Sequence, residues 1–132
     1  MSRKLLIESA ETIVVKVGSS VLTDQYGLDL GRVGRLADQI ARLIAKGKHV
    51  VLVSSGAVAS GVSKAALGRP PRSMPEKQAC AALGQSSLMQ AYELAFGRHG
   101  IKVAQVLLTA DGLHNRKRFL NARNTFNTLL EW

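Results

Sequence analysis

The sequence is poor in cysteine, proline and aromatic residues, and each shortage narrows the class of protein. A single cysteine, Cys80, excludes an intramolecular disulfide and agrees with a reducing compartment. Three prolines and no low-complexity tract argue against disorder. Because aromatic residues make up only 5% of the 132 residues, the core of the expected single compact domain must be mostly aliphatic.

Long hydrophobic runs are also missing. No apolar run approaches the ~18 residues that a membrane-spanning helix needs. The N-terminal segment MSRKLLIESAET has too short an apolar stretch for the central region of a signal peptide. We therefore expect a cytoplasmic protein.

Acidic residues are scarce: 9 Asp and Glu face 18 Lys and Arg, giving a net charge of +9. Such a balance raises the question of a nucleic acid or another polyanion as partner. The basic residues are spread along the chain, however, and the one run, Arg116 to Arg118, has no interleaved stacking aromatics. The pattern favours a solvated basic surface, with polyanion binding as an alternative function.

The first part of the chain has the pattern of a strand–helix–strand unit. The runs TIVVKV (residues 12–17) and HVVLV (residues 49–53) are typical of buried strands. Between them lie a loop-like stretch (residues 18–27), a capping residue at Asp29, apolar positions at helical spacing, and a helix end at Lys46-Gly47. Uninterrupted apolar strands joined by a helix predict a parallel sheet.

The second part predicts a long helix over residues 74–98, a third strand over residues 103–108 and a helix over residues 116–130. Ser73 and Glu76 have the spacing of a capping box at the start of the long helix. The predicted order of elements ends with a helix, whereas a doubly wound domain would return to its sheet with another strand at this point. We expect an α/β fold, a three-layer αβα arrangement with a mainly parallel sheet that is incomplete here. The alternative is a complete small three-stranded protein.

Two loops follow the carboxyl ends of the predicted strands, where open α/β sheets bind ligands. The first contains Lys16, Gly18 and Ser19, with Ser20 next to them. A lysine near the end of an apolar strand needs a partner, and a phosphate would supply one, helped by the backbone and hydroxyl donors of the loop. The alternative is an exposed lysine followed by an ordinary turn.

The second loop lies within VSSGAVASG, residues 53–61, which contains only small or β-branched residues. A helix that begins near Gly56 would direct free N–H groups and a partial positive charge at an anion above the strand end. Ser55 would then lie at the N-cap-like position and bond either a ligand or the helix. Small residues here, and Gly84 inside the long helix, are also explained by close packing.

Several common sites are excluded or weak. The sequence has no GxxxxGK[ST], GxGxxG or GxSxG motif. The three histidines lack metal-ligand spacing, and Cys80 lies among alanines in the predicted long helix, as a small core residue would. No acidic residues pair in a way that predicts acid–base catalysis or a bound Mg²⁺.

At these residues the sequence resembles the glutamate 5-kinase branch of the amino acid kinase family. The resemblance is carried by five segments in order: IVVKVGSSVLT, VVLVSSGAVASG, KQACAALGQSSLMQAY, AQVLLT and RKRFLNARNTFNTLL. Other members of the wider family share the lysine–glycine loop but neither SSGAVASG nor RFLNARNT.

The resemblance implies ATP- and Mg²⁺-dependent phosphorylation of the γ-carboxylate of L-glutamate, the first step of proline biosynthesis. It implies that Lys16 is catalytic and contacts the transferring phosphoryl group, that Gly18 and Ser19 bind the phosphates, and that Ser55, Gly56 and Ala57 hold glutamate. It also implies feedback inhibition by proline and a homo-oligomer in the full-length protein.

The resemblance further implies that residues 12–132 are the N-terminal, amino-acid-binding half of a kinase domain, preceded by an extension over residues 1–11. The acidic catalytic residues and the nucleotide-base site would then lie outside this chain, and we expect the chain alone to be inactive. A non-catalytic amino-acid-binding or regulatory module is the main alternative.

Overall fold

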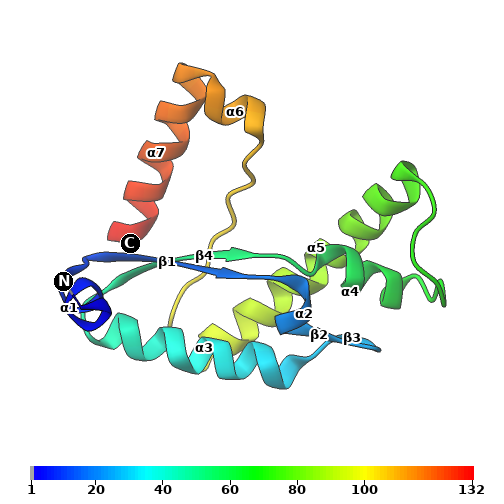
Figure 1. Cartoon of the computed structure of the whole chain (residues 1–132), viewed down its shortest axis with the longest axis horizontal. Helices are drawn as coiled ribbons and strands as arrows, with labels where there is room; N and C mark the ends of the chain where they lie inside the picture. Colours follow the sequence, from blue (N-terminus) through cyan, green and yellow to red (C-terminus); the bar gives the residue numbers. More distant parts are fainter. Residues whose placement is uncertain (1) are drawn as a thin grey trace. The chain divides into compact units, whose positions relative to one another are not determined.

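The computed structural model describes residues 2–132. The chain divides into two compact units, Met1–Lys102 and Val103–Trp132. After the short helix α1 (Arg3–Ser9), the first unit contains a parallel pair of strands, β1 (Thr12–Val17) and β4 (His49–Ser54), shown in Figure 1. Their register runs from Thr12 opposite His49 to Val17 opposite Ser54. The predicted α/β class with a parallel sheet is confirmed.

The connection between these strands is α3 (Leu30–Ala45), which begins and ends as its sequence predicts. The Asp29 carboxylate accepts a hydrogen bond from the Arg32 N–H at 3.1 Å and caps the helix. Gly47, just beyond the last turn, has φ +78°, a left-handed conformation that glycine adopts without strain. Val33, Ala37 and Ile40 are buried at helical spacing and form the centre of the core.

The long helix α5 (Met74–Gly97) packs against α3 and against the short helix α4 (Ala57–Lys64). The Ser73 hydroxyl accepts from the Glu76 N–H at 3.3 Å, so the predicted helix start is confirmed. Its buried face includes Cys80, Leu88, Tyr92 and Phe96. Cys80 is therefore the small core residue that the sequence predicts.

The prediction of a simple loop over residues 18–27 is wrong. This stretch forms a short helix, α2 (Ser19–Leu22), and a two-residue hairpin of β2 (Thr23–Asp24) and β3 (Gly27–Leu28). The Asp24 carboxylate accepts the Tyr26 N–H at 2.8 Å, and Gly27 supplies the φ of +117° that the turn requires. Turn residues here close a hairpin.

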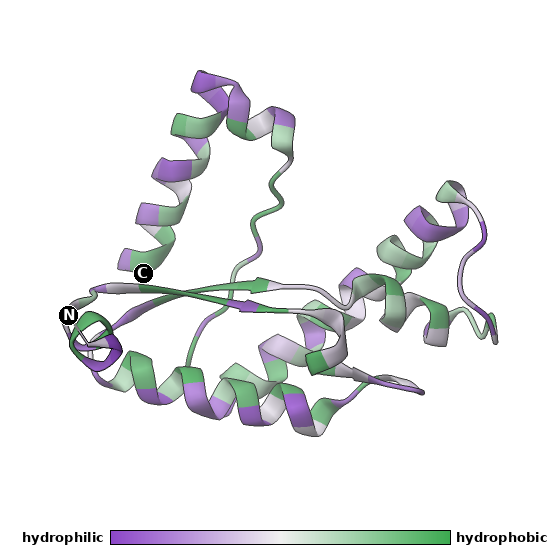
Figure 2. Ribbon diagram, viewed as in Figure 1, coloured by the Kyte–Doolittle hydropathy of each residue, from purple (hydrophilic) through white to green (hydrophobic). Residues whose placement is uncertain are grey.

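The prediction that both strands are fully buried is also wrong. The side chains of Val14 and Val53 are 65% and 47% exposed, and Lys16 on β1 is exposed as well. Val17, which points to the other face of the sheet, is buried. Figure 2 shows the largely hydrophobic colouring of both strands. Within the first unit, helices thus cover the face of the strand pair that contains Val17, and the face that contains Val14, Lys16 and Val53 is exposed.

In the second unit, the segment over residues 103–108 forms no strand, contrary to the sequence prediction. An apolar β-branched run becomes a strand only with a hydrogen-bonded neighbour, and in residues 2–132 no strand pairs with it. The unit otherwise consists of α6 (Ala110–His114) and α7 (Arg116–Glu131), the latter as predicted. Hydrophobic and hydrophilic residues alternate along α7 (Figure 2).

Among the described residues, no helix has both the length and the apolar composition of a membrane-spanning segment.

Candidate functional site

The two loops singled out in the sequence meet at one edge of the β1–β4 pair. Val17 and Ser54 are opposite each other at the carboxyl ends of the two parallel strands. One residue further, the Ser55 N–H donates a hydrogen bond of 3.1 Å to the Val17 carbonyl oxygen. This bond joins the two strand exits, so residues 16–19 lie beside residues 55–57.

The first loop leaves Lys16 and Gly18 accessible. Lys16 is exposed on β1 opposite Val53, so the expectation of a buried lysine in need of a partner is wrong. A Cβ added at Gly18 would meet no atom within 4 Å, so open space lies above the backbone here. Ser19 begins α2, and its carbonyl oxygen accepts the Thr23 hydroxyl at 2.8 Å. The first loop is thus accessible to a ligand, and the Thr23 hydrogen bond restrains the Ser19 carbonyl group.

The second loop is built around Gly56, which has φ +114° and is the N-cap of α4. A side chain would be strained at this φ, which explains the glycine. The expectation that Ser55 caps the helix is wrong, because the N-cap lies one residue later. Ser55 is exposed, and Ala57 is half-buried as the first residue of α4.

The N-terminus of α4 differs from those of the longer helices. Asp29, Ser73 and Asn115 cap α3, α5 and α7 with side-chain oxygens, whereas Gly56 provides no side-chain hydrogen bond. Within residues 2–132, no side chain caps the first-turn N–H groups of α4. Together with the partial positive charge of the helix end, these donors suit a carboxylate or phosphate.

The small residues of α4 also serve helix packing. A Cβ at Gly61 would overlap the carbonyl oxygen of Cys80 on α5, and a Cβ at Gly84 would overlap the carbonyl oxygen of Ala57. Both glycines are buried, so the backbones of the two helices approach each other directly. The packing explanation offered for VSSGAVASG and Gly84 is confirmed.

Tyr92 of α5 contacts the end of β4 next to the site. This contact is not predicted from the sequence. The Tyr92 hydroxyl lies 2.6 Å from the Ser54 Oγ, at the last residue of β4. The same Ser54 hydroxyl lies 3.0 Å from the Ser55 carbonyl oxygen. Burial raises the pKa of the Tyr92 phenol, which keeps it neutral and able to donate. A tyrosine on a core-facing helix position gives no sequence signal for this contact.

A groove of about 780 Å³ opens next to the first loop, between the β2–β3 hairpin, α4 and the α4–α5 connection. The Ser63 hydroxyl donates to the Tyr26 carbonyl oxygen at 2.6 Å and fixes the hairpin on α4. On the opposite wall, both Arg69 terminal nitrogens bond the Glu76 carboxylate, at 2.9 and 3.0 Å. Ser19 lines this groove, so the groove reaches the loop that follows β1.

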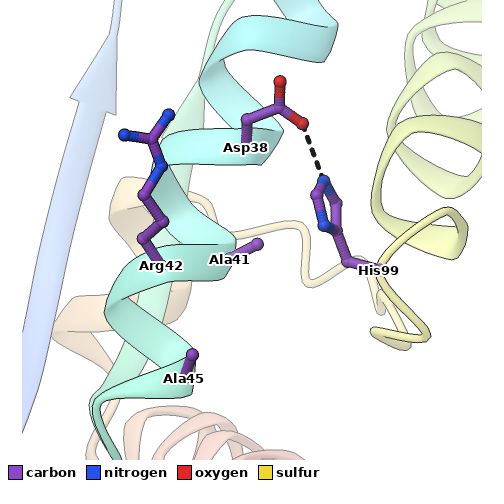
Figure 3. Close-up of a pocket in the computed structure, with 5 residues that line it drawn as sticks. All are labelled: Asp38, Ala41, Arg42, Ala45 and His99. Carbon is purple, nitrogen blue, oxygen red and sulfur yellow. Dashed lines mark hydrogen bonds and ion pairs between the residues drawn. The ribbon is translucent and has the colours of Figure 1, made fainter.

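A second, smaller hollow lies on α3 (Figure 3). Its lining consists of Asp38, Ala41, Arg42, Ala45 and His99. The His99 Nε2 lies 2.7 Å from the Asp38 Oδ1, and this contact links α3 to the residues after α5. None of the predicted site residues lines this hollow.

In residues 2–132, no group of three or more His, Cys, Asp or Glu side chains gathers that could hold a metal ion.

Comparison with known proteins identifies the family of the chain. The chain is 53% identical over 129 residues to a glutamate 5-kinase of Pelobacter propionicus, covering 97% of this chain and 35% of the relative. It is 55% identical over 132 residues to a glutamate 5-kinase of Oleidesulfovibrio alaskensis, covering 98% of this chain and 34% of the relative. The chain thus spans about a third of the length of the curated relatives it matches. The sequence profile of the amino acid kinase family matches residues 11–132, and the chain belongs to this family.

Proposed function

We propose that this chain forms the glutamate- and phosphate-binding part of an enzyme that transfers the γ-phosphoryl group of ATP to the γ-carboxylate of L-glutamate. The product, glutamyl 5-phosphate, is the first intermediate of proline biosynthesis. The observation that carries the proposal is the Ser55 N–H to Val17 carbonyl bond of 3.1 Å. It brings Lys16, Gly18 and Ser19 next to Ser55, Gly56 and Ala57 at one sheet edge.

The two loops divide the work between the two anions. Ser55, Gly56 and Ala57 hold glutamate, whose negative charge suits the uncapped first turn of α4. Lys16 is the catalytic residue that contacts the transferring phosphoryl group, and Gly18 and Ser19 bind the phosphates. A carboxylate oxygen attacks the γ-phosphorus and ADP leaves. The transfer depends on charge neutralisation and in-line placement, which a lysine and two fixed loops supply in part.

Mg²⁺ remains part of the proposal because phosphoryl transfer from ATP uses it to neutralise phosphate charge. Residues 2–132 contain no cluster of three or more His, Cys, Asp or Glu side chains for this ion. Proline inhibition, a homo-oligomer, a cytoplasmic location and the division into an extension (residues 1–11) and half a kinase domain (residues 12–132) remain predictions of the resemblance.

The test is glutamate-dependent formation of glutamyl phosphate from ATP by the full-length gene product that contains this chain. We expect Ser55→Ala to raise the KM for glutamate by ~10-fold, the cost of one hydrogen bond to a charged ligand. Ser86→Ala is the matched control, because Ser86 is an exposed serine of α5. The absence of glutamate-dependent ADP release by the full-length protein would rule out the proposal.

A further inference from the structure

Arg32 makes an unusual set of contacts for a helix-surface arginine. It lies in the first turn of α3, and its side chain is 41% exposed. The Arg32 Nη1 donates hydrogen bonds of 3.0 Å to two main-chain carbonyl oxygens, those of Ser20 and Thr23. These hydrogen bonds lie outside the regular bonding of α3. They connect the helix to residues 20–23, which are called the α2 turn below.

The Arg32 side chain is itself fixed. Its Nε lies 3.1 Å from the Asp29 Oδ2, while the Asp29 Oδ1 accepts the Arg32 backbone N–H at 3.1 Å. The carboxylate that caps α3 thus also orients the guanidinium. The Asp29 N–H donates to the Leu22 carbonyl oxygen at 2.8 Å, which adds a third tie between α3 and the α2 turn.

The α2 turn passes this restraint to the proposed phosphate loop. The Thr23 hydroxyl donates to the Ser19 carbonyl oxygen at 2.8 Å, and the Val21 N–H donates to the Gly18 carbonyl oxygen at 3.1 Å. Gly18 itself has no atom within 4 Å of a built Cβ, so little else confines it on that side. The position of Gly18 and Ser19 therefore depends on where Ser20 and Thr23 are held.

The glutamate loop lies near the same turn. The nearest atom to a Cβ built on Gly56 is the Thr23 methyl carbon, at 3.8 Å. Thr23 thus lies near Gly56 of one loop and is hydrogen-bonded to Ser19 of the other. A shift of its carbonyl group would change the spacing between the proposed phosphate and glutamate sites.

We propose that Arg32 is a positioning residue for phosphoryl transfer, acting through the carbonyl groups of Ser20 and Thr23 to fix the Gly18–Ser19 loop. The inference rests on the proposed function. The guanidinium donates to both carbonyl oxygens through Nη1 while its Nε faces Asp29, and the single ammonium nitrogen of a lysine cannot divide these contacts over two fixed nitrogens. Small misplacements of reacting groups reduce transfer rates steeply, so the effect belongs to turnover more than to binding.

The experiment compares Arg32→Gln and Arg32→Lys in the full-length gene product, with Arg35→Gln as matched control. Arg35 is an exposed arginine one turn away on the same helix. For Arg32→Gln we expect kcat to fall by ~10-fold or more, with the KM for glutamate changed by less than ~3-fold. Arg32→Lys keeps the charge and should give an intermediate kcat at an almost unchanged melting temperature. Arg35→Gln should match the wild type.

The readouts separate three outcomes. An unfolded Arg32→Gln would leave the decision to Arg32→Lys, whose lowered kcat would support the inference. Wild-type kcat in a folded Arg32 variant, whatever its melting temperature, would overturn the inference and reduce Arg32 to a structural residue. An inactive wild-type protein would instead refute the proposed function, and the inference would fall with it.

Discussion

Lys16 is the single side chain on which the proposed chemistry depends most. It is exposed on β1 and opposite Val53, so its removal should change the free energy of unfolding by less than ~0.5 kcal/mol. If it neutralises charge on the transferring phosphoryl group, Lys16→Ala should lower kcat by ~100-fold or more. Steady-state kinetics and denaturant unfolding of the full-length protein measure both. Lys46→Ala, an exposed lysine at the end of α3, is the control, and an unchanged kcat in Lys16→Ala would remove Lys16 from the mechanism.

Substitution of Tyr92 tests whether its contact with Ser54 stabilises the loop of Ser55, Gly56 and Ala57. Tyr92→Phe removes the 2.6 Å contact with Ser54 and should cost ~1 kcal/mol of stability. Because Ser54 precedes Ser55, we expect the KM for glutamate to rise while kcat changes little. Tyr26→Phe is the matched control, since Tyr26 is 77% exposed. A Tyr92→Phe variant with wild-type stability and KM would show that the contact contributes nothing.

Some residues of the proposed site can be predicted from the sequence around them, and others cannot. Gly18 and Gly56 follow apolar strands, so their places at strand exits could be predicted from local pattern. Tyr92 and Arg32 could not, because their contacts join positions 38 and 9–12 residues apart. Lys16 was placed correctly at the strand end, but its exposure depends on which face of the sheet the helices cover.

At the scale of elements, the α4–α5 contact is the most sensitive joint beneath the site. Gly84→Ala would drive a methyl group into the Ala57 carbonyl, and overpacking of this kind costs ~1–3 kcal/mol. Gly34→Ala is the matched control, because a Cβ at Gly34 in α3 meets nothing within 4 Å. That variant should gain up to ~1 kcal/mol from helix propensity. Denaturant unfolding measures both changes, and equal effects of the two substitutions would contradict the packing account.

The connection between α4 and α5 should be pH-sensitive. Hydrogen bonds from the Arg69 guanidinium and the Arg72 N–H hold the pKa of Glu76 at about 2, below its ordinary 4.5. A lowered folded-state pKa means that the Glu76 contribution is present above pH 4.5 and is lost as the pH falls towards 2. The melting temperature of Glu76→Gln should therefore lie below that of the wild type at pH 7, and the difference should shrink below pH 4.5.

The control for this titration is Glu93→Gln, an exposed residue on the same helix. Its melting temperature should follow that of the wild type at every pH. A difference between Glu76→Gln and wild type that stays constant down to pH 2 would contradict the assigned pKa.

Elements with local signals were the ones that could be predicted. α3 and α5 carry caps and apolar periodicity in their own sequences, and both form where expected. Residues 103–108 have strand composition but no strand, because pairing is a property of two segments and not of one. The β2–β3 hairpin was missed because its strands are only two residues long.

The whole chain covers about a third of the length of its relatives, and its first unit exposes Val14 and Val53 on one face of the β1–β4 pair. Its proposed site has one catalytic lysine and no acidic metal cluster in residues 2–132. We therefore expect the 132-residue chain, expressed alone, to form no measurable glutamyl phosphate from ATP and glutamate. Exposed Val14 and Val53 should also make it bind hydrophobic dyes more strongly than the full-length protein does.

Calorimetry on the full-length protein separates a kinase from the alternative functions. Glutamate and ATP are titrated separately, with D-glutamate as the control for the amino acid site. Binding of glutamate without binding of ATP would favour the amino-acid-binding module, because a kinase needs both sites. Steeply salt-dependent binding to nucleic acid would favour the polyanion alternative that the charge of +9 raises. Glutamyl phosphate formation by the isolated chain would contradict the expectation that the chain alone is inactive.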